Sequence, residues 1–262
     1  MAKSRSGSEE RARRVLEKVL RRPVTRHDDG RLPGMYDLRV GSAEAPEIAI
    51  ECVGAVDPER TATWNIGPAK GSETLDLLGD WSVVLQARAN VKAVRKNIER
   101  ILQRCEAIGL FGFTPVEGWL RRQRPELYDA LSALRIESLH CLRSAGSGRV
   151  DFGMAGVGGA VDEEGRALPG WVGEFLRDPA RADVLTKLGA SAATERHVFI
   201  PVSFGGAPWL VESYLGTTSE VVPTDAPDLP VPVTAVWLTY GARGIRWNGK
   251  EWLLFDASVN ER

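Results

Sequence analysis

The chain has 262 residues, of which 43% are hydrophobic, and its 34 lysines and arginines nearly balance its 35 aspartates and glutamates. This composition excludes an intrinsically disordered protein and permits one large domain or two smaller ones. The longest apolar runs are much shorter than the ~20 residues that cross a bilayer. The three cysteines stand far apart, and the first residues contain no apolar signal segment. We therefore expect a cytoplasmic globular protein that does not act at membranes.

Basic residues are concentrated in three segments, although the overall charge is close to neutral. The first 26 residues, residues 88–104 and residues 121–124 are each rich in lysine and arginine. Such segments either contact phosphate groups or form the solvated faces of helices, and the sequence leaves both interpretations open. The cations of the middle segment are Arg88, Lys92, Arg95, Lys96, Arg100 and Arg104.

The first 53 residues predict a helix followed by a β-hairpin. Acidic residues after Ser8 and the apolar spacing behind them are typical of an amphipathic helix, which Pro23 ends. Polar and apolar residues alternate over residues 35–40 and again over 47–53, with a turn-rich connection between them. We expect these two segments to pair as antiparallel strands.

Strands and helices alternate along the rest of the chain, which predicts an α/β protein with a mixed sheet flanked by helices. The remaining predicted elements are a strand at 81–86, a helix from Asn90 to Gly109, a mainly helical segment at 116–143, a helix near 179–188, strands at 197–202 and 233–238, and a hairpin at 247–250. We expect residues 1–110 to form the first part of the core. Residues 111–262 would add a helical insertion and a C-terminal extension of strands and loops, packed with that core as one domain.

Two acidic residues face each other in the predicted hairpin. If Val40 lies opposite Ile48, then Asp37 lies opposite Glu51, because opposed residues of an antiparallel pair have a constant sum of numbers. Opposed Cβ atoms are about 4.5–5.5 Å apart. Two carboxylates this close repel each other unless a cation lies between them, and Mg²⁺ or Mn²⁺ prefers such oxygen ligands. The alternative is a pair of ordinary surface residues, with Arg39 as an ion-pair partner.

The same residues resemble a known family. A leading helix, Tyr36-Asp37 and the strand Ile48-Ala-Ile-Glu51-Cys-Val53 are similar to the core of the PD-(D/E)XK restriction-endonuclease-like superfamily, over roughly residues 8–108. The resemblance implies a restriction-endonuclease-like mixed sheet. It also implies that Asp37 and Glu51 bind Mg²⁺ together with the carbonyl of Cys52, and Glu17 is the candidate acid from the first helix.

The sequence departs from the family pattern at the lysine that follows the glutamate. In the family this lysine stands two residues after the glutamate, where this chain has Val53. A valine can neither stabilise the charge of a phosphoryl transition state nor orient a water molecule. Some related sequences carry the lysine on a neighbouring element, which makes Lys92 and Lys70 candidates. Gln86 is a candidate for a polar contact in place of the lysine.

The leading functional hypothesis is Mg²⁺- or Mn²⁺-dependent hydrolysis of nucleic-acid phosphodiesters, with DNA favoured over RNA. The alternative, suggested by Val53, is a catalytically inactive nuclease-fold protein that binds nucleic acid or another protein. A third hypothesis is a protein-interaction module whose contact surface contains the proline-rich segment 223–232 and the late tryptophans. A homodimer is compatible with each hypothesis.

Overall fold

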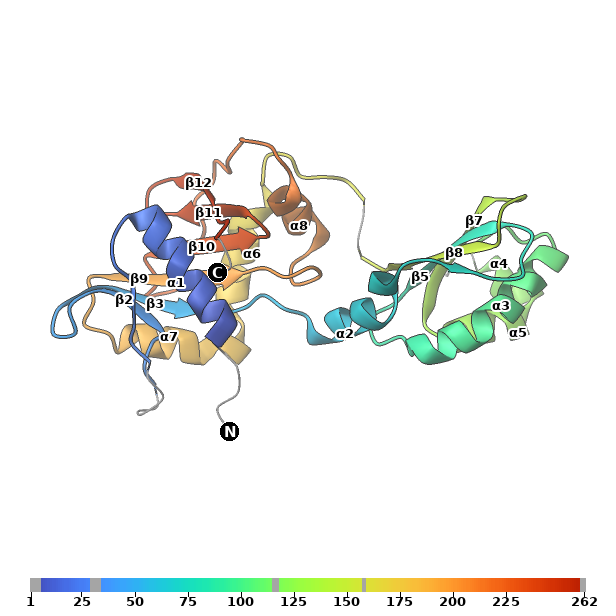
Figure 1. Cartoon of the computed structure of the whole chain (residues 1–262), viewed down its shortest axis with the longest axis horizontal. Coiled ribbons are helices and arrows are strands. Elements are labelled where there is room, and N and C mark those ends of the chain that lie inside the picture. Colours follow the sequence, from blue (N-terminus) through green and yellow to red (C-terminus); the bar gives the residue numbers. More distant parts are fainter. Residues whose placement is uncertain (1–5, 29–33, 115–117, 157–158, 260–262) are drawn as a thin grey trace. The chain divides into compact units, whose positions relative to one another are not determined.

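The computed structural model describes residues 6–28, 34–114, 118–156 and 159–259 and divides the chain into two compact units. Unit 1 comprises residues 1–56 and 158–262, and unit 2 comprises residues 57–157. Each unit contains its own mixed sheet with flanking helices (Figure 1). The chain is therefore a mixed α/β protein, as the sequence predicts.

Unit 1 is built on a seven-stranded sheet of order β1-β2-β3-β9-β10-β11-β12. Its strands are β1 (Thr25–Arg26), β2 (Leu38–Gly41), β3 (Pro46–Cys52), β9 (Glu195–Pro201), β10 (Ala235–Tyr240), β11 (Arg243–Trp247) and β12 (Trp252–Asp256). Strand β9 pairs in parallel with both β3 and β10, and the other pairs are antiparallel. Its helices are α1 (Ser6–Leu20), α6 (Ala167–Arg177), α7 (Ala182–Gly189) and α8 (Trp209–Gly216), with a 3₁₀ turn at Pro179–Arg181.

The β2–β3 hairpin has the register expected from the sequence. Val40 pairs with Ile48, and Leu38 pairs with Ile50. All four side chains are buried because they face a helix rather than solvent. Extending this register by one residue beyond the Leu38–Ile50 pair places Asp37 opposite Glu51.

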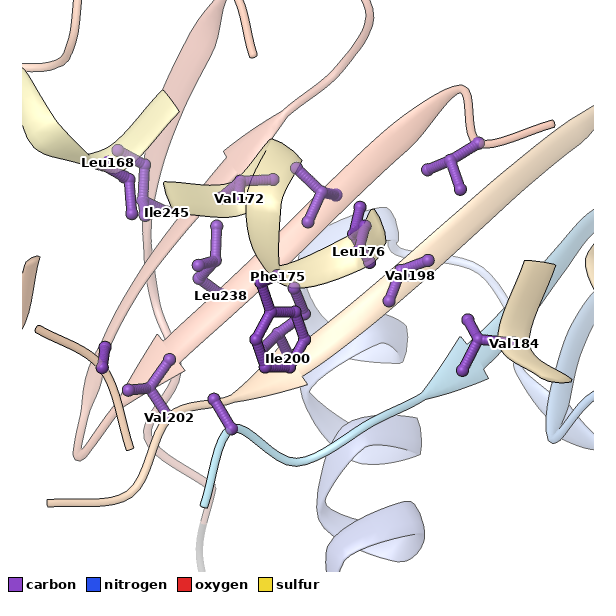
Figure 2. Close-up of a cluster of buried hydrophobic side chains, with 14 of the residues drawn as sticks. Leu168, Val172, Phe175, Leu176, Val184, Val198, Ile200, Val202, Leu238 and Ile245 are labelled. Carbon is purple, nitrogen blue, oxygen red and sulfur yellow. The ribbon is translucent and has the colours of Figure 1, made fainter. Parts of the chain in front are cut away.

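Helices cover both faces of the unit 1 sheet. Val15 and Leu16 of α1 pack on one face in a cluster with Phe199 and Trp237. The opposite face is covered by α6, α7 and α8. Figure 2 shows Phe175 of α6 directly over the strands of this second cluster. Because both faces are covered, the central parallel strands are buried on both sides and lack the alternation of a half-exposed strand.

Unit 2 has a separate five-stranded sheet of order β4-β8-β5-β7-β6. Its strands are β4 (Glu73–Thr74), β5 (Asp80–Leu85), β6 (Gly112–Phe113), β7 (Ile136–Arg143) and β8 (Arg149–Met154). Its helices are α2 (Pro58–Ile66), α3 (Val91–Ala107), α4 (Trp119–Gln123) and α5 (Pro125–Ala133), with a 3₁₀ turn at Pro68–Lys70. The inner face of α3 joins a core that contains Trp81, Val83 and Leu102.

The division of the chain differs from the sequence-based expectation. The expected boundary at residue 110 lies inside unit 2. The strand at 81–86 and the helix that follows it form as β5 and α3, but in unit 2 rather than beside the hairpin. Besides β2, the strand that pairs with β3 in unit 1 is β9, which comes more than 140 residues after β3 in the chain.

The helical prediction for residues 116–143 is wrong for its last eight residues, which form β7. Residues 116 and 117 lie outside the described residues, and α4 and α5 occupy much of the part in between. The left-handed backbone of Arg135, with φ of 55°, separates α5 from β7. Leucines spaced three to five residues apart fit either a helix face or a buried strand. This pattern alone therefore does not show where the helix ends and the strand begins.

Two of the late tryptophans, Trp237 and Trp252, are buried in the cores of unit 1. They are therefore packing residues and not part of an exposed contact surface. None of the helices in the described segments has the combination of length and apolar composition that a bilayer-spanning helix requires.

Candidate metal and hydrolytic site in unit 1

A polar cleft of about 280 Å³ lies at the end of β3, between α1 and α7. Its acidic and basic side chains come from three parts of the chain that are distant in sequence. The hairpin supplies Asp37 and Glu51, α1 supplies Glu9, and α7 supplies Lys187. The complete lining is Ser8, Glu9, Asp37, Glu51, Cys52, Val53, Gly54, Asp183, Val184 and Lys187.

Asp37 is held rigidly just before β2. Its carbonyl accepts a hydrogen bond from the N–H of His27 at 2.8 Å, and its Oδ2 accepts one from the N–H of Cys52 at 2.7 Å. The side chain is 8% exposed. Burial raises the pKa of Asp37, and the hydrogen bond from Cys52 opposes this shift. The carboxyl group is thus fixed against the end of β3, which carries Glu51.

Glu51 is buried, and only one of its two carboxylate oxygens has a hydrogen-bond partner. Its Oε1 accepts a hydrogen bond from Nζ of Lys187 at 2.6 Å, whereas its Oε2 is buried without a hydrogen-bond partner. Burial raises the pKa of Glu51 to about 7, the charge of Asp37 adds to this shift, and Lys187 opposes it. An unpaired buried carboxylate oxygen costs free energy unless a cation or a proton satisfies it.

Lys187 is the lysine beside Glu51, and the sequence analysis missed it. Burial lowers the pKa of its ammonium group, but the hydrogen bond and charge of Glu51 outweigh burial, so the pKa is raised. The ammonium therefore stays charged in a side chain that is 22% exposed. Asp183, one helical turn earlier on α7, lies 3.8 Å from the same Nζ.

The sequence contained only a faint signal for Lys187. It stands 136 residues after Glu51, and its spacing of four from Asp183 is common on exposed helix faces. Nothing local connects α7 with the hairpin. The two meet only in the folded protein, where α7 packs against β3 and the strand that follows α7, β9, pairs in parallel with β3.

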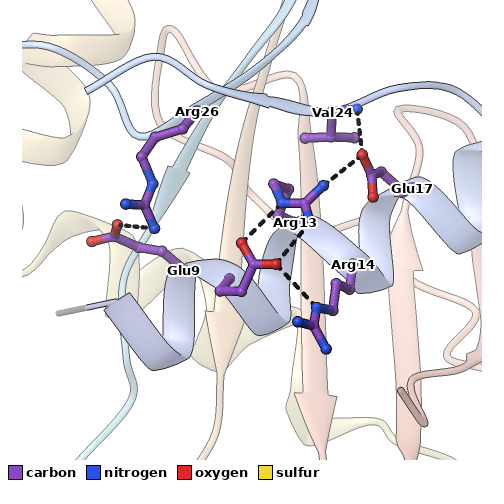
Figure 3. Close-up of polar contacts among 7 residues, drawn as sticks. Glu9, Arg13, Arg14, Glu17, Val24 and Arg26 are labelled. Atoms are coloured by element: carbon purple, nitrogen blue, oxygen red, sulfur yellow. Dashed lines mark hydrogen bonds and ion pairs between the residues drawn. The ribbon is translucent and has the colours of Figure 1, made fainter. Parts of the chain in front are cut away.

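The acid that α1 contributes to the cleft is Glu9, so the assignment of Glu17 is wrong. Glu17 lies eight residues, or about 12 Å, farther along the helix. There its Oε1 lies 2.7 Å from Arg13 and accepts the N–H of Val24 at 3.2 Å (Figure 3). Glu9 instead lines the cleft and acts on the pKa of Asp37 through its charge.

The three polar residues proposed as substitutes for the family lysine belong to unit 2 and are absent from the lining of this cleft. Gln86 donates a hydrogen bond from its amide to Glu137 at 2.6 Å. Lys92 is exposed on α3, and Lys70 is exposed at the end of a 3₁₀ turn. Val53 lines the cleft at the position of the missing lysine, and its N–H donates to the carbonyl of Phe199 at 2.9 Å.

The donor atoms of the cleft fit a hard divalent cation. Burial raises the pKa of the Cys52 thiol far above its usual value, so this residue offers no thiolate. What remains are carboxylates, those of Glu9, Asp37, Glu51 and Asp183, which suit Mg²⁺ or Mn²⁺ better than Zn²⁺. In the described parts of the chain, no three His, Cys, Asp or Glu side chains form a metal-binding cluster. Water and substrate oxygens would have to complete the coordination.

The alternative of two ordinary surface acids does not describe this geometry, because both carboxyl groups are buried. Arg39, the expected surface partner, contacts Oγ1 of Thr25 and Nδ1 of His27, each at 3.2 Å. No protein-family model, no curated protein and no solved structure matches this chain significantly.

Proposed function

We propose that unit 1 is a metal-dependent nuclease of the PD-(D/E)XK type, in which Lys187 of α7 replaces the lysine that is absent at Val53. The observation that carries the proposal is the state of Glu51. One of its oxygens accepts a hydrogen bond from the partly exposed Lys187, and the other is buried without a partner beside a second carboxylate.

The two carboxylates would hold the cation in this proposal. Asp37 and Glu51 would bind Mg²⁺ or Mn²⁺, with the carbonyl of Cys52 as a further oxygen ligand. The cation would satisfy Oε2 of Glu51 and relieve the repulsion between the two acids. When bound, it would supply Lewis acidity toward a phosphodiester oxygen and favour deprotonation of the attacking water.

Lys187 would stabilise negative charge on the phosphoryl group. It is held in place by Glu51 and Asp183, and it is partly exposed at the cleft. A fixed ammonium in a partly desolvated site is worth more to a transition state than one in bulk water. Glu9 would raise the negative charge of the cleft and so favour cation binding, because its charge acts on Asp37.

The substrate in this proposal is a nucleic acid in the cytoplasm, with DNA favoured over RNA. Calorimetric titration with MnCl₂ and MgCl₂ should show binding to the wild-type protein that Asp37→Asn and Glu51→Gln each abolish. Linear and supercoiled DNA, single-stranded DNA and RNA should then be incubated with the protein and Mg²⁺. We expect cleavage of at least one of these substrates, with DNA cut faster than RNA.

Lys187→Met separates catalysis from metal binding. We expect it to retain cation binding and to lower cleavage on the order of 10²–10³-fold, the typical effect of removing one charge-stabilising donor. Lys187→Arg should recover part of the activity. The matched control is Lys18→Met, because Lys18 also pairs with an acid of unit 1, Asp256 at 2.8 Å, but outside this cleft.

Two outcomes would replace the proposal. Cation binding without cleavage of any substrate would favour the inactive nuclease-fold alternative. Absence of cation binding, or equal loss of cleavage in Lys187→Met and Lys18→Met, would refute the role of the cleft.

A further inference from the structure

The cations of α3 in unit 2 fall into two groups. Arg95 pairs with Glu73, and Arg104 pairs with Glu126 at 3.0 Å. Just before the helix, Arg88 pairs with Glu59. The remaining three are Lys92, Lys96 and Arg100, which we call the α3 row. They are exposed, and within the described residues none of them forms an ion pair.

The α3 row lies on one face of the helix. Its members are spaced by four residues, so their side chains follow one another at steps of about 6 Å along the axis. The apolar residues of α3 face the opposite way, into the core of unit 2. The row therefore presents three positive charges to solvent over about 12 Å.

This arrangement is unfavourable for the helix itself. Like charges at positions i and i+4 destabilise an isolated helix. Lys92 also stands in the first turn of a 17-residue helix, where the helix dipole disfavours a cation and favours an anion. Both penalties vanish when negatively charged groups lie along the row.

The basic residues of α1 provide a contrast. Arg13 and Arg14, both labelled in Figure 3, pair with Glu10 of the same helix, and Lys18 pairs with Asp256. The guanidinium of Arg11 donates to the carbonyl of Gly241. The protein thus neutralises the cations of α1 internally and leaves those of the α3 row available to a partner.

We propose that the α3 row of unit 2 binds the phosphodiester backbone of a nucleic acid, independently of base sequence. A single strand of a duplex has one phosphate per about 3.4 Å of axis, so the 12 Å row spans about three phosphates. Lysine and arginine side chains without base-reading partners give affinity and little sequence preference. The inference rests on the proposed function for the choice of polyanion, and it identifies the surface that holds the substrate.

The test measures binding without cleavage. The full-length protein is titrated into a fluorescein-labelled 20-base-pair DNA duplex in EDTA, and the anisotropy is followed at 50–200 mM salt. We expect Lys92→Glu/Lys96→Glu/Arg100→Glu to weaken binding on the order of 10²-fold at 100 mM salt. The corresponding triple alanine variant should reduce the slope of log K against log salt by about 2.7, or ~0.9 for each lost phosphate contact.

The matched control reverses the same number of charges elsewhere. Lys70→Glu/Arg143→Glu/Lys250→Glu changes three exposed cations outside α3 and leaves the net charge identical to that of the row variant. We expect the control to bind within a few-fold of wild type. Circular dichroism and thermal unfolding should show that both variants are folded.

The inference would be overturned if the wild type did not bind nucleic acid, if the row variant bound as tightly as the wild type, or if the row and control variants lost equal affinity. It would also be overturned if the row variant lost binding to anionic phosphatidylserine vesicles but kept its binding to nucleic acid. Duplex RNA and single-stranded DNA, tested in parallel, identify which nucleic acid supplies the phosphates.

The two proposals can fail separately. A wild type that binds DNA through the row but cuts nothing would refute the nuclease and leave the row intact. If the wild type cuts DNA and the row variant binds DNA as tightly as the wild type does, the role of the row is refuted and the nuclease proposal stands.

Discussion

Glu51→Gln is the substitution whose effect follows most directly from the structure. In the cation-free protein, burial raises the pKa of Glu51 from its ordinary value of 4.5 to about 7. The folded state therefore favours the protonated carboxyl, and the stability that this provides is complete below pH 4.5 and lost as the pH rises through 7. One pKa unit corresponds to about 1.36 kcal/mol, so ionised Glu51 costs the folded state about 3 kcal/mol at pH 8.

Glutamine has the shape of the protonated side chain and does not titrate. At pH 5, where most of this stabilisation is still present, the variant should exceed the wild type by less than about 1 kcal/mol. At pH 8 the variant should be more stable by about 3 kcal/mol, because it lacks the buried charge. Taking the difference between the two proteins cancels the titration of all other groups.

Urea unfolding in EDTA at pH 5, 6, 7 and 8 measures this difference. Adding 10 mM Mg²⁺ at pH 8 should stabilise the wild type by mass action and leave the variant unchanged. If the difference in free energy of unfolding does not change with pH, burial does not raise the pKa of Glu51. If the wild type becomes more stable than the variant as the pH rises, the ion pair with Lys187 outweighs the cost of burying the Glu51 carboxylate. The reasoning from the unpaired oxygen would then be refuted.

Three further predictions concern unit 2. Leu102→Ala should lower the free energy of unfolding by about 2–5 kcal/mol because Leu102 is fully buried, whereas Leu78→Ala, at a side chain 73% exposed, should change it little in the same urea titration. Gly148→Ala should lower the melting temperature, because the backbone has φ of +76° and an added Cβ would lie 2.1 Å from the carbonyl oxygen of Leu75; an unchanged melting temperature would contradict this geometry. Glu106 accepts two backbone N–H groups and an indole N–H, which outweigh burial and lower its pKa, so its contribution is present above pH 4.5 and lost as the pH falls. Glu106→Gln should therefore cost on the order of 1 kcal/mol at pH 7 and less at pH 3, and an equal cost at both pH values would refute this linkage.

Local patterns predicted the hairpin of unit 1 well. The alternation of residues 35–40 and 47–53 determines which side chains face α1, and a slip by one residue would have turned all of them to the opposite face of the sheet. The resulting register, with Val40 opposite Ile48, is confirmed. Asp37 and Glu51 could therefore be paired from the sequence alone, and both line the same cleft.

Long-range pairing was beyond the reach of such patterns. The run Glu195–Pro201 is recognisable as a buried strand, but nothing in its residues states that it pairs with β3 rather than β5. A parallel neighbour across a long connection is chosen by the packing of the whole unit. For this reason the insertion of unit 2 and the approach of Lys187 to Glu51 could not be predicted from the sequence.

The insertion has a consequence for biosynthesis. Unit 2 occupies residues 57–157, between the strand that carries Glu51 and the helix that carries Lys187. Ribosomes add about 5–20 residues per second, so the hairpin waits roughly 7–30 seconds for the more than 140 residues that separate β3 from β9. During this interval the β3 edge lacks its parallel neighbour, while unit 2 is already complete in sequence. A nascent chain thus displays the α3 row before the cleft of unit 1 can close around its lysine.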